Sequence, residues 1–288
     1  MRVYVLLITS VFIWGATWIS GRVLAQDMGP FSAAFLRFFA ASIFLFLWSC
    51  RINKKLPSLR KENIQGLVVL GLSGVFCYNF FFFSGLQTVA AGRAALIIAS
   101  IPVIICLASA VLFKEKLTRK KIIGSLLSLA GVSIVLAKGN PLNLLQDPVS
   151  QGDLMILGCV VSWAVYTLAG NRVMHKVNPL EAVTWSCIIG DVLLLPFALY
   201  HGLAMDIHTA HFVDWANLLF LGVVATGLAF TWYYQGIQAL GPAKAGIFIN
   251  LVPVFAVLLG FLILGEPIYI SLLLGGTLTI TGVWLTNR

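Results

Sequence analysis

The chain is poor in charge. Only 10% of its 288 residues are Asp, Glu, Lys or Arg, whereas soluble domains usually carry about 25%. Hydrophobic residues make up 60%, which is more apolar surface than a soluble globule of this length can cover with polar groups. This balance excludes a soluble enzyme, a disordered chain and a coiled coil. It predicts an all-α polytopic membrane protein.

Motifs for catalysis and for metal binding are also lacking. No GxxxxGK[ST] loop, HExxH helix or nucleophile elbow is present, so nothing indicates ATP use or hydrolysis. The five cysteines form no CxxC pair and lie in apolar stretches, which favours buried thiols. A polar loop after the seventh apolar run fits a solvated loop better than a metal site, although it contains His201, Asp206, His208, His211 and Asp214. We therefore expect no cofactor, no metal and no catalytic residue.

The net charge of +9 could suggest a nucleic-acid partner. The basic residues instead cluster in short gaps between apolar runs, where they act as signals of membrane topology. We therefore expect a lipid bilayer and a small-molecule substrate as partners, and no nucleic acid.

Ten apolar runs are long enough to cross a bilayer as helices. They cover residues 3–25, 31–50, 64–86, 94–113, 122–137, 154–171, 180–201, 215–237, 245–264 and 268–286. The first run could also be a secretory signal, because Val23-Leu24-Ala25 resembles a cleavage site. A later copy of this run argues that it is retained.

The second half of the chain repeats the first. Matching residues are spaced by 149 or 151 positions, as in Trp14/Trp163, Pro30/Pro179, Gly71/Gly222, Gly85/Gly236, Gln87/Gln238, Pro102/Pro253, Glu115/Glu266 and Gly131/Gly282. The repeat predicts two five-helix units, residues 1–140 and 150–288. A seam of small residues recurs in both units and predicts close helix packing, with Gly124, Ser128 and Gly131 matching Gly275, Thr279 and Gly282.

Because five is odd, homologous units must be inverted relative to each other. With both termini in the cytoplasm, the basic gaps at 51–61 and 114–121 lie inside, and their equivalents at 202–214 and 265–268 contain no Lys or Arg. Equivalent loops with opposite charge bias indicate an inverted-topology repeat, the arrangement that supports alternating access. The alternative is a duplication that only made a stable bundle.

Several motifs resemble the drug/metabolite transporter superfamily, in its ten-span EamA branch. They are Ile13–Trp18, Phe35–Phe38, Gly246–Val254 and Leu264–Glu266, read as IWGATW, FLRF, GIFINLVPV and LGE. The resemblance implies a carrier with a central cavity lined by spans 1, 3, 4, 6, 8 and 9. It does not imply one substrate, because such proteins handle amino acids, vitamins, sugars, quaternary amines and drugs.

Candidate substrate-binding residues on those spans have amphipathic side chains. They are Trp14, Thr17, Trp18, Tyr78, Asn79, Phe82, Ser100, Trp163, Tyr166, Trp232, Tyr233, Gln235 and Asn250. For each aromatic ring the alternative is packing against lipid or at the membrane interface. For the two buried asparagines the alternative is a hydrogen bond to a neighbouring helix.

A second group of residues is expected to serve gating or structure: Arg37, Pro102, Glu115, Asp191, Pro253 and Glu266. The prolines free helix carbonyls at mid-span. Arg37 and Asp191 should face the bundle or water, because a charge at a helix centre costs roughly 2.5–3.5 kcal/mol. Arg37 could be structural or contact substrate, and Ser186 stands at its repeat position. Asp191 could be a proton site or a hydrogen-bonded structural acid.

These features together predict a secondary transporter in the bacterial cytoplasmic (inner) membrane. It would move small polar or amphipathic metabolites, preferably amino acids or their analogues, by alternating access. Export is the preferred direction by family analogy alone. The alternative is an importer of a cofactor precursor, sugar derivative or quaternary amine on the same fold. An intramembrane enzyme or lipid-binding scaffold is a further alternative, and monomer or homodimer stays open.

Overall fold

The computed structural model describes residues 1–54, 57, 59, 61–86, 88–89, 91–137, 149–265 and 269–288. Within these residues the regular structure is helical and contains no strand, which confirms the all-α fold. The described part has eight helices long and apolar enough to cross a membrane: Arg2–Asp27, Pro30–Ile52, Lys61–Leu86, Gln151–Val173, Pro179–Tyr200, Phe212–Leu240, Pro242–Leu264 and Ile270–Asn287. The protein is therefore a multi-pass membrane protein.

The first half begins with two long helices and continues with shorter segments. In order they are α1 (Arg2–Asp27), α2 (Pro30–Asn53), α3 (Lys61–Leu70), the π-helix η1 (Gly71–Cys77), α4 (Tyr78–Leu86), α5 (Ala91–Ile98), α6 (Ile101–Phe113) and α7 (Arg119–Leu136). The expected span 94–113 is thus two helices, because the chain turns at Ala99 and Ser100. Residues 122–136 of the expected span 122–137 lie in α7, whose first turn is basic.

The second half has the same succession with two added segments. It comprises α8 (Gln151–Val173), α9 (Pro179–Tyr200), α10 (Leu203–Thr209), α11 (Phe212–Leu219), the π-helix η3 (Phe220–Leu228), α12 (Ala229–Leu240), α13 (Pro242–Gly246), the 3₁₀ helix η4 (Ile247–Asn250), α14 (Leu251–Leu264) and α15 (Ile270–Asn287). The added segments are α10, which follows α9, and η4, which lies between α13 and α14.

Helix starts follow from local chemistry. Pro30 and Pro179 are the first residues of α2 and α9, where proline loses no helix hydrogen bond. The Asn178 side chain accepts a hydrogen bond from the Glu181 backbone N–H at 2.9 Å. Ser150 and Asp153 form a reciprocal capping box at the start of α8.

The two prolines expected at mid-span stand at helix starts. Pro102 lies in the first turn of α6, directly after the interruption that ends α5. Pro253 is in the first turn of α14, after η4. Pro102 thus begins a second helical segment after the turn at Ala99 and Ser100, whereas Pro253 follows a 3₁₀ turn inside the continuous helical run Pro242–Leu264.

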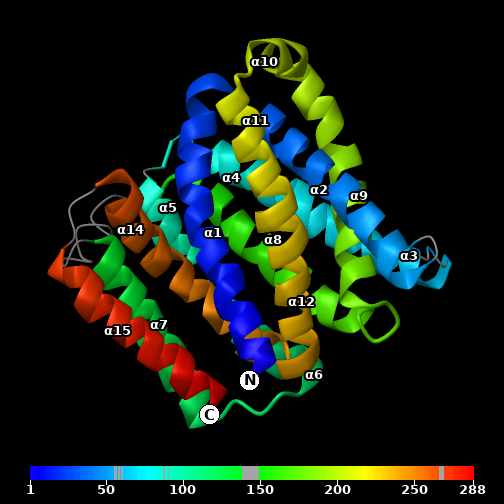
Figure 1. Cartoon of the computed structure of the whole chain (residues 1–288). Helices are drawn as coiled ribbons and strands as arrows, with labels where there is room; N and C mark the ends of the chain where they lie inside the picture. The colour runs from blue at the N-terminus through cyan, green and yellow to red at the C-terminus, as the bar shows by residue number, and fades with distance from the viewer. Residues whose placement is uncertain are drawn as a thin grey trace.

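Helices from opposite halves pack in pairs. α7 packs along α15 and α2 along α9, while α1 contacts α12 and α14 and α8 contacts α4 and α6 (Figure 1). A Cβ atom on Gly131 would lie 2.5 Å from the Gly275 carbonyl oxygen, and one on Gly282 would lie 2.5 Å from the Gly124 carbonyl oxygen. Only glycine allows this approach of α7 and α15.

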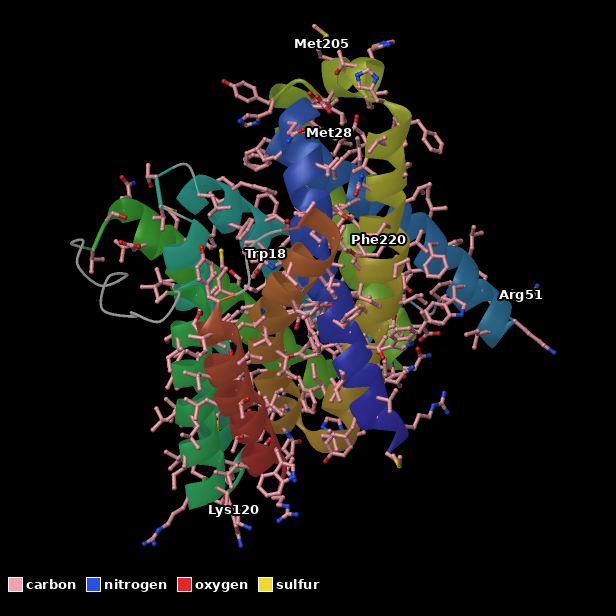
Figure 2. The ribbon with its side chains drawn as sticks, turned by 60° about the vertical axis from the view of Figure 1, so that its left-hand side comes forward. Trp18, Met28, Arg51, Lys120, Met205 and Phe220 are labelled. Carbon is pink, nitrogen blue, oxygen red and sulfur yellow. The ribbon has the colours of Figure 1, made fainter. Side chains whose placement is uncertain are left out.

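The two ends of the bundle carry different segments. Figure 1 places both termini at the same end. Lys120, in the first turn of α7, lies at that end, whereas Met28 and Met205 lie at the opposite end (Figure 2). The basic segment 114–121 and helix α10 are therefore separated by the length of the bundle.

Candidate functional site

Aromatic rings from both halves meet inside the bundle. We define the aromatic cluster as Trp14 of α1, Tyr78 of α4, Trp163 and Tyr166 of α8, and Phe230 and Tyr233 of α12. Trp163 contacts all the other members. Its ring centroid lies 5.6 Å from that of Trp14 and 5.4 Å from that of Phe230, both in edge-to-face geometry. Aromatic pairs prefer this geometry.

Five of these rings were expected from the sequence, and Phe230 was not. The missed ring lies three residues before Tyr233 and is buried on the same face of α12. Its helical spacing from Tyr233 is the signal that could have found it. The cluster is nearly closed in this conformation, since Trp14 is 9% exposed, Trp163 7% and Tyr233 0%.

The two cluster tryptophans differ in hydrogen bonding. Trp14 Nε1 donates to the Ala225 carbonyl oxygen at 2.9 Å. Ala225 lies in η3, where wider π-helical turns change the backbone bonding pattern. Trp163 Nε1 is buried and has no hydrogen-bond partner among the described residues. The cluster therefore holds one satisfied and one unsatisfied indole donor.

The tyrosine hydroxyls of the cluster face polar groups of α8 and α9. The Tyr166 hydroxyl is 3.4 Å from Ser186 Oγ, and the Tyr233 hydroxyl is 3.4 Å from Thr167 Oγ1. These contacts fix the polar edge of the cluster on the side of the second half.

Other candidates lie outside the cluster or bond to their own helix. Trp18 is 37% exposed. Trp232 and Gln235 are half-buried, and the helical period places them about 100° and about 160° around α12 from Tyr233. Phe82 is half-buried and stacks on Tyr78 with centroids 6.1 Å apart. Two hydroxyls donate to the carbonyl three residues earlier, both at 2.6 Å: Thr17 to Trp14 and Ser100 to Ile97.

The two buried asparagines have different partners. Asn250 Nδ2 donates to Ser128 Oγ at 3.0 Å and so joins η4 to α7. Asn79 Nδ2 donates to the Val75 carbonyl at 2.6 Å, within the preceding π-helical segment. Asn250 thus makes the bond to a neighbouring helix that the sequence left as an alternative.

The two ionisable residues within spans are not paired with each other. Arg37 is half-buried on α2, with its Cζ atom 4.5 Å from the centroid of the buried Phe38 ring. Its ionisable neighbours are Tyr78 and Cys187. Asp191, one turn beyond Cys187 on α9, is buried, and its Oδ1 atom has no hydrogen-bond partner among the described residues.

The candidate gating residues at the surfaces make local contacts. Glu115 forms an ion pair with Lys121 at 2.8 Å, near the end that carries the termini. Glu266, its repeat equivalent, lies outside the described residues. At the opposite end, Gly29 N–H donates to Asp206 at 3.2 Å and joins α10 to the start of α2.

A metal site is not indicated by the side chains. Among the described residues no three His, Cys, Asp or Glu side chains are grouped so that they could hold a metal ion. His201, one of the loop histidines, stacks on Phe31 with ring centroids 4.6 Å apart. The candidate site is therefore the aromatic cluster and the unpaired groups beside it.

Relatives of this chain are transporters. An uncharacterized transporter of Bacillus subtilis, YyaM, is 29% identical over 98% of this chain and 92% of its own length. A probable terminal-alkyne amino-acid exporter of Streptantibioticus cattleyicolor is 27% identical over 98% of this chain and 92% of its own length. A solved crystal structure, 21% identical, superposes with a TM-score of 0.81 and covers 99% of this chain and 97% of its own, which shows the shared fold.

The family model described as the EamA-like transporter family matches residues 1–137 and 150–288. This family indicates a transporter and not an enzyme, with a lipid bilayer around it and a small molecule as substrate. The resemblance seen in the sequence motifs is thereby confirmed, and the chain belongs to the EamA-like transporter family.

Proposed function

We propose that this transporter exports small amphipathic metabolites, amino acids or their analogues, across the bacterial cytoplasmic membrane by alternating access. The observation that carries the proposal is the aromatic cluster, which draws rings from α1 and α4 of the first half and from α8 and α12 of the second. A site between two halves can open to one side of the membrane at a time as the halves move against each other.

An inverted ten-span architecture is part of the proposal. Reciprocal contacts support it: Gly85 lies against Ile156, and the equivalent Gly236 lies against Leu7. The π-helices at residues 71–77 and 220–228 start 149 positions apart. In this architecture α5 with α6 forms the fourth crossing and α7 the fifth.

Orientation follows from the charges. The basic segment 114–121 and both termini share one end of the bundle, and the positive-inside rule assigns that end to the cytoplasm. The opposite end, with α10, then faces outward.

The chemistry of the cluster favours amphipathic substrates. Rings supply apolar walls, and the free Trp163 Nε1 supplies a donor that a polar substrate group could engage. The amino-acid exporter among the relatives supports amino acids or analogues as the class, and export as the direction.

A quaternary amine is a second candidate, because aromatic rings surround such cations in cation–π cages. The nearby Arg37 guanidinium disfavours it, since Arg37 adjoins Tyr78 of the cluster and would repel a cation. The remaining alternative is an importer of a cofactor precursor or sugar derivative on the same fold. Measuring the direction of transport and the identity of the transported substrate distinguishes it from the main proposal.

The test is transport by the purified full-length protein in proteoliposomes, with a panel of radiolabelled amino acids and choline. We expect flux of at least one amino acid, lowered about 10-fold or more by Trp163→Ala because the ring contacts every other cluster member. Trp18→Ala is the matched control on an exposed tryptophan. Equal flux in wild type and a folded Trp163→Ala protein would contradict the site, and choline flux without amino-acid flux would favour the second candidate.

A further inference from the structure

Arg37 stands beside the aromatic cluster without a counter-charge. Its Cζ atom is 4.5 Å from the Phe38 ring centroid, and the Phe38 ring lies 6.5 Å from that of Phe230 in the cluster. Tyr78, whose ring lies 5.4 Å from that of Trp163, is within electrostatic range of the guanidinium. Phe38 thus lies between Arg37 and the cluster, and the Arg37 charge acts on one cluster member, Tyr78.

No described acid neutralises this cation. Arg37 makes no ion pair with the described residues, and its Nε atom is buried without a hydrogen-bond partner. The described acids other than Asp191 lie at or near helix ends or in loops: Asp27, Glu62, Glu115, Asp153, Glu181, Asp206 and Asp214. Asp191 on α9 is the one described acid inside a long helix, and it is not paired with Arg37.

Ionisable side chains within membrane-spanning segments face the bundle interior or a water-filled cavity and mark substrate or ion pathways. Arg37 is also half-buried, so the surrounding helices do not enclose its side chain completely. The planar guanidinium has a fixed fork of donors that matches a carboxylate in two hydrogen bonds.

The two repeat positions that correspond to Arg37 differ in charge. Ser186 stands at the position equivalent to Arg37, donates to the Val183 carbonyl at 2.9 Å and faces the Tyr166 hydroxyl. The position equivalent to Arg37 on α9 is therefore uncharged, and the Arg37 charge on α2 would orient a substrate with its anionic end toward α2.

We infer that Arg37 is the carboxylate-binding residue of this transporter. Its substrates carry a carboxylate joined to an apolar body, the carboxylate bound by the Arg37 guanidinium and the apolar body packed against Tyr78 and Trp163. The inference rests on the proposed function and narrows it from amphipathic metabolites to amphipathic carboxylates. It also gives Arg37 a direct role at the substrate, where the sequence had left a structural role open.

The experiment compares ligands that differ by one group. Competition against labelled L-phenylalanine and L-leucine is measured on the full-length protein in nanodiscs at neutral pH. The competitors are 3-phenylpropionate and 4-methylpentanoate, which lack the amine, and phenethylamine and 3-methylbutylamine, which lack the carboxylate. We expect the acids to compete and the amines to compete about 10- to 100-fold more weakly, the range expected for a hydrogen bond to a charged group.

Variants assign this preference to one residue. Arg37→Gln should remove the preference for carboxylates, and Arg37→Lys should keep part of it because the charge remains. The matched control is Arg51→Gln, on an exposed arginine in the last turn of the same helix (Figure 2). It should leave the preference unchanged.

Three outcomes would overturn the inference: amines that compete as well as acids, a preference that survives in Arg37→Gln, or a preference lost equally in Arg51→Gln. If Arg37→Gln does not fold, the same ligand series is compared between the wild type and Arg37→Lys. A carboxylate preference equal in the two proteins would then overturn the inference. A wild-type protein that transports and binds none of the amphipathic panel would overturn the proposed function as well. Transport of the panel without a carboxylate preference would overturn only the role of Arg37.

Discussion

The two halves of the chain depart from regular α-helix at equivalent places. Each has a π-helix in its third long helix, at residues 71–77 and 220–228. Each ends its fourth helical run in a left-handed residue, Lys114 with φ 55° and Gly265 with φ 66°. These two departures from regular α-helix are thus common to both halves.

Side chains inside this shared frame differ. Trp14 Nε1 donates to the Ala225 carbonyl oxygen, whereas Nε1 of the equivalent Trp163 has no hydrogen-bond partner among the described residues. The residue three positions after each tryptophan explains part of this difference. It is Thr17 in the first half and Tyr166 in the second, and the Tyr166 ring lies against Gly74, which is the repeat equivalent of Ala225. Duplicated backbones with unequal side chains can bind one asymmetric substrate in one orientation.

The largest expected effect concerns the opposed ends of the bundle. In a cysteine-free chain, Lys120→Cys places a single thiol at one end of the bundle, and Met205→Cys places a single thiol at the opposite end (Figure 2). In intact cells a membrane-impermeant maleimide should label the thiol at position 205 and not that at position 120, because basic loops stay inside. Mass-shift gels read the labelling. Equal labelling of both positions would contradict the inverted arrangement, and Arg2→Cys should behave like Lys120→Cys.

The next effect tests the packing that the halves share. Gly275→Ala should destabilise the protein by about 1–3 kcal/mol, because its Cβ would lie 2.5 Å from the Gly131 carbonyl oxygen. Gly276→Ala is the adjacent control, since its Cβ would meet only Val254 Cγ1 at 3.4 Å. SDS-induced unfolding of purified protein gives the free energies of unfolding. Gly124→Ala, at the equivalent site, should match Gly275→Ala, and a large loss in Gly276→Ala would count against this packing.

The smallest effect tests where the halves differ. Trp14→Phe and Trp163→Phe remove the same indole nitrogen, but only Trp14 loses a hydrogen bond and leaves the Ala225 carbonyl unpaired. We expect Trp14→Phe to lower the free energy of unfolding by about 1–3 kcal/mol more than Trp163→Phe does. The same unfolding assay measures both. Equal losses would mean that the two tryptophans have equivalent surroundings.

Hydropathy predicted the long helices well and their interruptions poorly. The expected runs 31–50 and 154–171 lie within α2 and α8, and both ends differ by only a few residues. The π-helices and the break at Ala99 and Ser100 were not predicted, because apolar residues continue through them. An apolar run indicates that a segment is buried in lipid or protein. It does not indicate whether the backbone hydrogen bonds join residues four apart, as in an α-helix, or five apart, as in a π-helix.

The site was predicted in part. Trp14, Trp163 and Tyr233 were expected and lie together, whereas Trp232 and Gln235 are half-buried and turned away from Tyr233 around α12. A membrane helix is apolar on all sides, so its sequence has no polar face that would indicate its rotation. That rotation follows only from packing against neighbours.

The sequence by itself determined the membrane class, the internal repeat and the unequal charge of equivalent loops, because composition and spacing are properties of the chain. The tertiary structure alone decided which rings meet, that Arg37 has no partner among the described acids and that Asn250 bonds to Ser128. These outcomes depend on how each helix is turned and how closely glycines let two helices approach, and a linear pattern fixes neither.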